Sequence, residues 1–226
     1  LNKAELSPSQ INFLFAGDLL NQSIASTFGM REYGVPILGQ FGACSTMAQT
    51  LAMAAIFVDS GAADICAAVT SSHFCSAERQ FRFPLEYGGQ RPPTAQWTVT
   101  GSGCAVVGMG GTGVKIADIT VGYITDLGIN DTNNMGAAMA PAAAETLTAF
   151  FKDTNTKPDD YELIITGDLA AVGSELLRQL MERKGYPLGA NYTDCGLLIF
   201  DRSKQDVHAG GSGCGCSASV LCSYIL

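Results

Sequence analysis

One seven-residue pattern occurs twice in this chain of 226 residues, and it limits the possible folds more than any other feature. Residues 13–19 read Phe-Leu-Phe-Ala-Gly-Asp-Leu and residues 163–169 read Leu-Ile-Ile-Thr-Gly-Asp-Leu, so each is an apolar run that closes on Gly-Asp-Leu. A second match follows, because Gly-Ala-Cys-Ser at residues 42–45 corresponds to Cys-Gly-Cys-Ser at residues 214–217. Matching blocks in the same order indicate two copies of one structural unit.

The repeat predicts an α/β fold with two halves, residues 1–112 and residues 113–226, joined in a glycine-rich stretch. In the first half, short apolar runs alternate with stretches of helical periodicity. The most regular stretch runs from Met47 to Val58, and because its other positions are mostly Ala we expect a helix buried on all sides. Continuous apolar strands between helices predict mainly parallel sheets in a layered α/β/α arrangement. The strands predicted in this half are residues 11–16, 35–38, 65–70 and 104–107.

The second half contains segments that the first half lacks. Residues 114–123 and 142–152 precede its Gly-Asp-Leu block and predict a strand and a helix. The spacing from Gly-Asp-Leu to Cys-Ser is also longer, and the apolar run at residues 195–200 predicts an extra strand there. The first half has little sequence before its block, and the second stops inside the helix that follows Cys-Ser. We therefore expect the chain to be part of a longer protein.

The composition excludes several classes of protein. Apolar residues make up 47% of the chain and charged residues only 15%, against about 25% in an average domain, so intrinsic disorder is excluded. The net charge of −8 cannot neutralise a phosphate backbone, and we expect no nucleic-acid partner. The most apolar stretch, residues 51–58, is far shorter than the roughly 20 residues that cross a bilayer, so no transmembrane helix is predicted.

The eight cysteines include no Cys-x-x-Cys pair, and most stand in apolar surroundings, which is typical of core thiols in a reducing compartment. The two histidines, His73 and His208, are isolated in the sequence. The residues therefore predict no metal site.

Cys44 is the first candidate for a functional residue. It stands where a predicted strand has ended and the predicted helix begins, so its sulfur would lie at the positive end of the helix dipole, which lowers the pKa of a thiol. His73 ends the next predicted strand, and adjacent parallel strands direct their carboxyl ends to one crevice. The alternatives are a structural cysteine on a tight turn and a histidine that only satisfies hydrogen bonds.

Basic residues cluster directly after His73. Arg79 and Arg82 would share one face of a helix, and such a pair could hold two carboxylates. Trp97 could supply a flat surface for a ring nearby. The alternative is a solvated helix in which Arg82 pairs with Glu78 and Glu86.

Four further positions complete the candidate set. Asp18 and Asp168, the carboxylates of the two Gly-Asp-Leu blocks, precede predicted helices, and capping is the simplest interpretation of both. Ser45 or Thr46 could cap the helix that follows Cys44. Gly213 closes a glycine-rich stretch that lacks the nucleotide-binding patterns and could let the backbone approach a ligand.

A duplicated α/β unit with Cys44 at the start of a buried helix resembles the thiolase fold, the architecture of thiolases and ketoacyl synthases. More narrowly, the chain resembles the stage V sporulation protein AD family of spore-forming Firmicutes, and the resemblance covers nearly the whole chain in order. The blocks that carry it are residues 16–22, 41–46, 70–73, 77–82, 86–90, 98–103, 126–129, 139–144 and 209–214.

The resemblance implies binding of dipicolinic acid, pyridine-2,6-dicarboxylic acid, free or as its calcium chelate, for uptake into the developing spore and release at germination. It implies a peripheral location at the inner membrane of the forespore or spore, with proteins of the same operon as partners, and a homodimer. It implies no cofactor, and calcium would arrive with the ligand. The residues expected to contact the ligand are Asp18, Cys44, Ser45, His73, Arg79, Arg82, Asp168 and Gly213.

The chain departs from the condensing enzymes of this fold at one position. Those enzymes are known for a His, or a His and an Asn, in the second half, at the loop where this chain reads Thr-Gly-Asp-Leu at residues 166–169. Without that group a thiol has no evident partner for decarboxylation or Claisen chemistry. We therefore expect binding without catalysis, and keep an acyl-thioester enzyme with Cys44 as nucleophile, and a scaffold for membrane partners, as alternatives.

Overall fold

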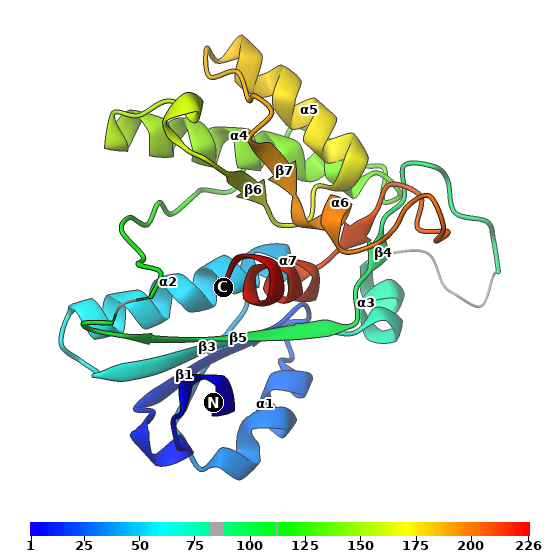
Figure 1. Cartoon of the computed structure of the whole chain (residues 1–226). Helices are drawn as coiled ribbons and strands as arrows, with labels where there is room; N and C mark the ends of the chain where they lie inside the picture. Colours follow the sequence, from blue (N-terminus) through cyan, green and yellow to red (C-terminus); the bar gives the residue numbers. More distant parts are fainter. Residues whose placement is uncertain (82–87, 112) are drawn as a thin grey trace. The chain divides into compact units, whose positions relative to one another are not determined.

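The computed structural model describes residues 1–81, 88–111 and 113–226, and within it the chain forms two compact units (Figure 1). Unit 1 comprises Leu1–Ala77, Thr98–Ala117 and Gly213–Leu226. Unit 2 comprises Glu78–Trp97 and Asp118–Ser212. This division differs from the two predicted halves, because unit 1 contains both ends of the chain. A repeat does not require each copy to be compact by itself, so the halves 1–112 and 113–226 stay a prediction.

Unit 1 is built on a four-stranded sheet. Strand β1 pairs in parallel with β2 on one side and with β3 on the other, and β5 runs antiparallel to β3. The prediction of a mainly parallel sheet is confirmed, with β5 as the exception at one edge. The strands, in sheet order, are β2 (Ile37–Gln40), β1 (Phe13–Asp18), β3 (Ile65–Ser72) and β5 (Gly101–Gly108).

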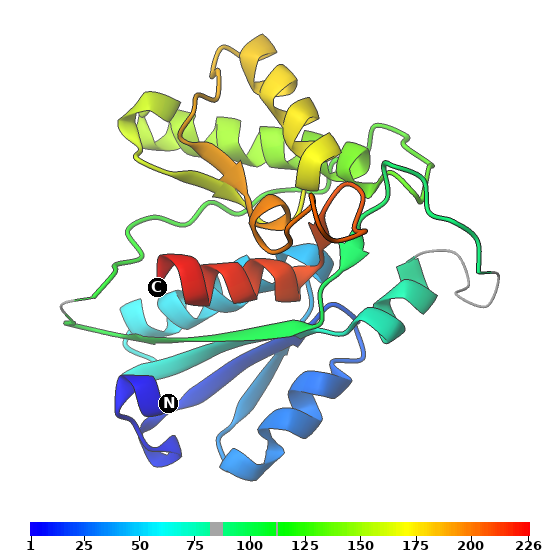
Figure 2. The same cartoon turned by 45° about the vertical axis from the view of Figure 1, so that its right-hand side comes forward.

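Helices cover both faces of this sheet (Figures 1 and 2). Helices α2 (Thr46–Asp59) and α7 (Cys214–Val220) lie side by side on one face, and α1 (Ile24–Met30) lies on the other. A core around Phe15 fills the α2 side, and a second core around Leu14 fills the opposite side. Successive residues of a strand point to opposite faces, which explains why neighbours in β1 belong to different cores.

Helix α2 is more exposed than we expected, and helix α7 is followed by a further helical turn. Helix α2 is not buried on all sides, because the side chain of Ile56 is 46% exposed and Ala48 is exposed as well. The chain continues from α7 into a turn of π-helix, Leu221–Ile225. No helix in the described part of the chain is long and apolar enough to cross a membrane.

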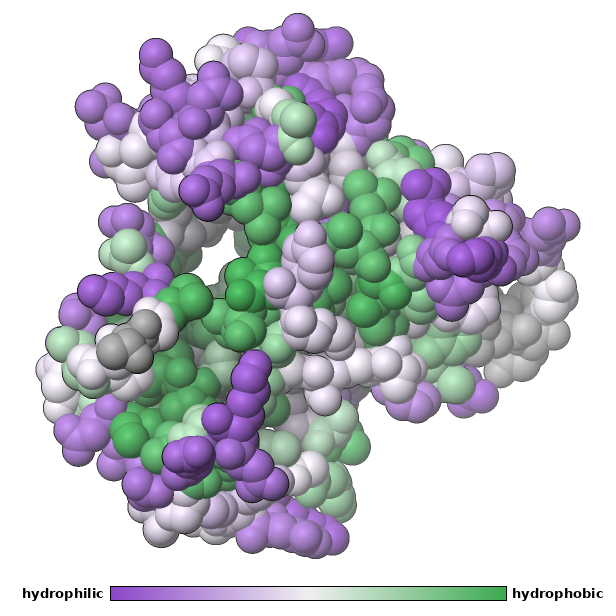
Figure 3. Space-filling model, viewed as in Figure 1, coloured by the Kyte–Doolittle hydropathy of each residue, from purple (hydrophilic) through white to green (hydrophobic). Residues whose placement is uncertain are grey.

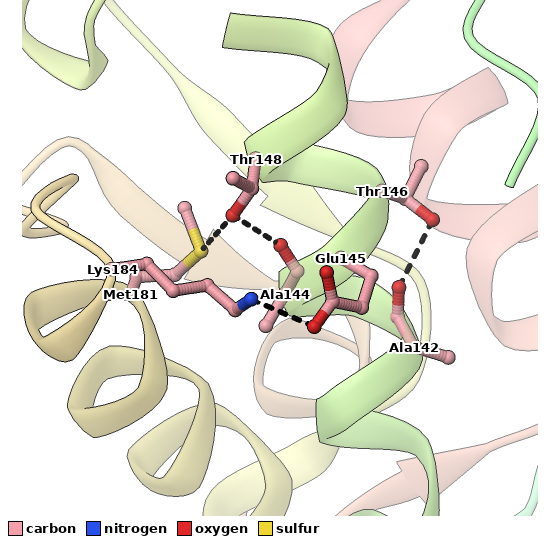
Figure 4. A network of polar contacts seen from close by, with 7 residues as sticks. All are labelled: Ala142, Ala144, Glu145, Thr146, Thr148, Met181 and Lys184. Carbon is pink, nitrogen blue, oxygen red and sulfur yellow. Dashed lines mark hydrogen bonds and ion pairs between the residues drawn. The ribbon is translucent and has the colours of Figure 1, made fainter. Parts of the chain in front are cut away.

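Unit 2 contains two long helices that pack on a short parallel sheet. Helices α4 (Met135–Thr154) and α5 (Ala170–Arg183) cross closely at Gly136 and Gly173, where a Cβ atom on Gly136 would lie 2.8 Å from the Gly173 nitrogen. Two side-chain contacts also join the helices: Thr148 Oγ1 donates to Met181 Sδ at 3.8 Å, and Glu145 forms an ion pair of 2.7 Å with Lys184 (Figure 4). The other elements are the parallel strands β6 (Ile164–Thr166) and β7 (Tyr192–Asp194), and helix α6 (Cys195–Leu198).

Three short elements stand near the boundaries between the units. Helix α3 spans Phe74–Phe81, and the two-residue strands β4 (Trp97–Thr98) and β8 (Gly211–Ser212) stand where the chain passes from one unit to the other.

In Figure 3 the sheet and its helices, in the lower part of the view, show much apolar surface, whereas α4 and α5 carry mostly hydrophilic surface.

Two predicted strands of the second half are wrong, and one helix is confirmed. The predicted strand at residues 195–200 is replaced by α6, because the Asp194 side chain accepts a hydrogen bond from Gly196 N at 2.8 Å and so caps a helix there. Residues 114–123 form neither strand nor helix, and the side chain of Val121 is 84% exposed. The predicted helix at residues 142–152 lies inside α4.

Candidate functional site

The carboxyl ends of β1 and β3 meet at one edge of the sheet in unit 1. Asp18 is in register with Ser71, and Leu19 N donates to the Ser71 carbonyl at 3.3 Å. Gly213 reaches the same edge, where a Cβ atom on it would lie 3.1 Å from Leu19 Cδ2 and 3.4 Å from Ser72 Oγ. Its φ of +92° also favours glycine. Segments far apart in the sequence therefore meet here.

Cys44 lies in a short turn between β2 and α2. The turn is a 3₁₀ helix, Ala43–Ser45, and Cys44 is half-buried in it. Ala43 has a φ of +48°, a conformation that is strained for a residue with a Cβ atom, so the surrounding contacts must hold it. Ser45 is the N-cap residue of α2, but its hydroxyl donates to the Gly42 carbonyl at 2.8 Å and makes no capping bond to the helix.

His73 follows β3 directly, and its side chain is exposed. Its carbonyl accepts hydrogen bonds from Ala77 N at 3.2 Å and from Ser76 Oγ at 3.1 Å, so the first turn of α3 starts from this residue. The residues of the predicted site that unit 1 contains are Asp18, Cys44, Ser45, His73 and Gly213.

Asp18 is 6% exposed, and its carboxylate is occupied by backbone groups. One oxygen accepts from Leu20 N at 3.4 Å and the other from Ala25 N at 3.2 Å, in the first turn of α1. This geometry supports the capping interpretation.

Arg79 and Asp168 belong to unit 2, and Arg82 lies outside the described residues, as do its predicted pairs with Glu78 and Glu86. Arg79 is exposed on α3. Its neighbour Glu78 is buried and pairs with Arg91 at 2.7 Å, an ion pair that the sequence analysis did not predict.

Arg91 is fixed on three sides within unit 2. Besides Glu78, it donates to the Gln96 carbonyl at 2.9 Å, and its guanidinium lies 4.5 Å from the centre of the Trp97 ring. One face of the Trp97 ring, considered above as a surface for a ligand, is therefore covered by a cation. Glu78 and Arg91 are 13 positions apart in the sequence, a spacing that gives no periodic signal, which is why the sequence did not indicate the pair.

Asp168 is 5% exposed and follows β6, and its carbonyl accepts from Gln96 Nε2 at 2.6 Å. Helix α5 has Leu169 as its N-cap residue, and the amides of Leu169 and Ala170 donate to Asp194 rather than to a side chain of the Gly-Asp-Leu block. Asp194 also accepts from Thr166 Oγ1 at 2.6 Å. The sequence around Asp194 does not indicate this role, because an Asp before Cys-Gly is a weak signal for a cap.

The buried carboxylates of unit 2 change the acidity of their surroundings. Burial, with a smaller contribution from the nearby charge of Asp168, raises the pKa of Asp194 to about 6, although hydrogen bonds from Thr166 and Ala170 act to lower it. Burial and the charges of Asp194 and Asp168 raise the pKa of the Cys195 thiol to about 12. Cys195 is therefore not a nucleophile at neutral pH.

Comparison with known proteins identifies the family. The family model of stage V sporulation protein AD matches residues 1–226. The chain belongs to the stage V sporulation protein AD family. Stage V sporulation protein AD of Bacillus subtilis (strain 168) is 51% identical over 225 residues, which cover 100% of this chain and 66% of that relative. The chain thus spans slightly less than two thirds of the length of this family member.

Solved structures of condensing enzymes share the fold. A tetronic acid condensing enzyme, AbyA1, is 14% identical with a TM-score of 0.63 and covers 98% of this chain and 72% of its own. The 3-oxoacyl-[acyl-carrier-protein] synthase III of Aquifex aeolicus VF5 is 15% identical with a TM-score of 0.59, and the match covers 98% of this chain and 70% of that enzyme. The H285N variant of Xanthomonas campestris OleA is 13% identical with a TM-score of 0.64, and the match covers 98% of this chain and 69% of that protein. These likenesses confirm the predicted thiolase-like fold.

The arrangement in unit 1 offers a half-buried thiol, an exposed histidine and a close backbone approach at one sheet edge. In unit 2, the loop at residues 166–169 carries no histidine and is held by Asp194. Among the residues that the structure describes, no group of three or more His, Cys, Asp or Glu side chains could hold a metal ion.

Proposed function

We propose that this member of the stage V sporulation protein AD family binds dipicolinic acid without transforming it. The observation that carries the proposal is the loop at residues 166–169, which stands where condensing enzymes of this fold are known for a catalytic His. Here the loop contains Asp168, and Asp194 accepts hydrogen bonds from the Leu169 amide of the loop and from the next amide, that of Ala170. Such a loop supplies no imidazole to hold a developing enolate, so a ligand is held and released unchanged.

The ligand is a planar ring with two carboxylates, and it needs donors and a narrow slot. Arg79, with Arg82 three residues later in the sequence, is the proposed clamp for the carboxylates. Cys44 and Gly213 are the proposed lining, because a thiol and a missing side chain leave room for a flat ring. His73 and Ser45 are the proposed polar contacts at its rim.

Charge favours the calcium chelate over the free dianion. The chain carries an excess of eight negative charges. A free dianion would meet these negative charges, whereas a calcium chelate brings its own compensating charge. Calcium is therefore proposed to arrive with the ligand.

The test is calorimetric titration of the chain with dipicolinate, with calcium and with a chelator. We expect saturable binding that calcium strengthens, and loss of at least about tenfold in affinity in the double variant Arg79→Ala, Arg82→Ala, since a charge-assisted hydrogen bond contributes about 1.5–3 kcal/mol. The double variant Arg183→Ala, Arg202→Ala removes two other exposed arginines and should bind as the parent does. Parent-like binding by the first variant would remove the arginine clamp.

An acyl-thioester enzyme is the second candidate, and the geometry of Cys44 is what favours it. The thiol follows the strained Ala43 and precedes the 14-residue helix α2. This function predicts that an acyl-CoA acylates Cys44 and that iodoacetamide labels it rapidly at neutral pH. Mass spectrometry of the Cys44 peptide decides, because a binding protein gives no acyl adduct.

We further propose a homodimer that acts peripherally at the inner membrane of the forespore or spore with proteins of the same operon. Strand β2 lies at an end of the sheet order; Leu38 within it is 38% exposed, and Phe41 directly after it is 45% exposed. An apolar edge strand is suited to pairing with a second copy. Light scattering should show the dimer, and Phe41→Ser should weaken it, while Phe28→Ser on α1 should not.

A further inference from the structure

The buried hydroxyl of Thr46 makes hydrogen bonds that hold the turn containing Cys44. Thr46 is fully buried, and its Oγ1 accepts a hydrogen bond from Gly42 N at 3.1 Å and donates to the Ala43 carbonyl at 2.8 Å. These two backbone groups belong to the residues directly before Cys44. The Thr46 hydroxyl therefore closes the turn on itself and holds Ala43 at its positive φ.

The same side chain joins this turn to the end of β1. Thr46 Oγ1 lies 3.4 Å from the carbonyl of Asp18, and the Thr46 methyl group packs where a side chain on Gly17 would be. A Cβ atom on Gly17 would also lie 2.7 Å from the Gln40 carbonyl, so the glycine is required for this close approach. The methyl group and the hydroxyl of Thr46 thus each make a separate contact.

We infer that Thr46 is a positioning residue, which sets the place of the Cys44 thiol at the ligand-binding edge of unit 1. The inference rests on the proposed function, because it takes Cys44 as part of the dipicolinate site. Because the Thr46 hydroxyl is hydrogen-bonded to both Gly42 N and the Ala43 carbonyl, it holds the turn in a single conformation. Without it, those groups turn toward water and Cys44 becomes more exposed.

Helix α2 offers a matched control one turn further on. Thr50 is also fully buried, and its hydroxyl donates to the Met47 carbonyl at 3.0 Å and lies 3.1 Å from Thr70 Oγ1. Its contacts lie in the helix and in β3, away from the Cys44 turn. Thr50→Val therefore measures the cost of removing a buried threonine hydroxyl from α2, and Thr46→Val adds any effect that is specific to the turn.

The first measurement needs no ligand. The rate at which iodoacetamide labels Cys44 is followed by mass spectrometry in the full chain at a temperature where each variant is folded. We expect Thr46→Val to label about tenfold faster than the parent, since the lost hydrogen bonds loosen the turn, and Thr46→Ser to label as the parent does. Labelling of Thr46→Val at the rate of Thr50→Val would overturn the inference. If the valine variant does not fold, Thr46→Ala removes the same hydroxyl.

The second measurement is a double-mutant cycle on dipicolinate affinity. Thr46→Val should weaken binding about tenfold in the parent, and less than about twofold when Cys44 is already Ala, because its effect passes through Cys44. An equal loss in both backgrounds shows a general structural role and overturns the inference. If the parent binds no dipicolinate, the proposed function fails, and the labelling rates still decide the role of Thr46.

Discussion

Asp194 is a buried carboxylate whose pKa is raised by its surroundings. Its carboxylate is fully buried and accepts from Thr166 Oγ1, from the amides of Leu169 and Ala170, and from Gly196 N. Burial still raises its pKa from 3.8 to about 6. The folded chain therefore holds a proton on this group at pH values where the unfolded chain has lost it.

The sign of the pH dependence follows. A carboxyl whose pKa is raised on folding favours the folded state most below pH 4, and this contribution falls as the pH rises from about 4 to about 6, by about 3 kcal/mol in total. Urea unfolding of the parent and of Asp194→Asn across this range should give a difference that declines with pH and is flat above about pH 6.5. Asp153→Asn, at an exposed carboxylate of α4, serves as the control, and a difference for Asp194→Asn that rises with pH would contradict the account.

The Glu78–Arg91 pair is a second prediction at this scale. The Glu78 side chain is 1% exposed and that of Arg91 is 19% exposed, so Arg91→Ala would leave a buried carboxylate without its cation. We expect a loss of about 3–5 kcal/mol in the free energy of unfolding. Arg79→Ala, one residue from Glu78 but exposed, should change it by less than about 0.5 kcal/mol. Equal effects of the two substitutions would show that the pair is not stabilising.

Between elements, two glycines should respond oppositely to the same substitution. A Cβ atom on Gly103 of β5 would lie 2.5 Å from the Ala218 carbonyl of α7, whose backbone cannot move aside. Gly103→Ala should therefore cost about 1–3 kcal/mol. Gly29 in α1 has open space around it, so Gly29→Ala should add about 0.5–1 kcal/mol through helix propensity. Urea unfolding measures both, and a neutral Gly103→Ala would contradict the close packing of α7 on β5.

The helices and strands show which parts of the fold local sequence patterns can predict. Strands β1 and β3 and helix α2 were predicted within a few residues, because apolar runs and 3.6-residue periodicity are local signals. Residues 195–200 have an equally apolar pattern but form α6, since the Asp194 cap depends on a hydrogen bond that the pattern does not show. Residues 114–123 have strand composition without strand pairing, because pairing needs a neighbouring strand.

At the scale of the molecule, the sequence indicated two copies, and the structure divides the chain differently. Residues 213–226 pack in unit 1, where Gly215 N donates to Ser72 Oγ at 3.0 Å across 143 positions of sequence. No local pattern predicts such a contact. The candidate site stays a prediction, and five of its residues belong to unit 1. Thr46 was expected only as a possible helix cap, because a threonine after a serine looks like an ordinary helix start.

Equilibrium dialysis of the chain against dipicolinate with calcium, followed by mass analysis of both ligand and protein, tests the central claim most directly. The account predicts that the retained dipicolinate is recovered chemically unchanged and that Cys44 carries no adduct. Failure of the chain to retain dipicolinate, or a covalent product on Cys44, would contradict it.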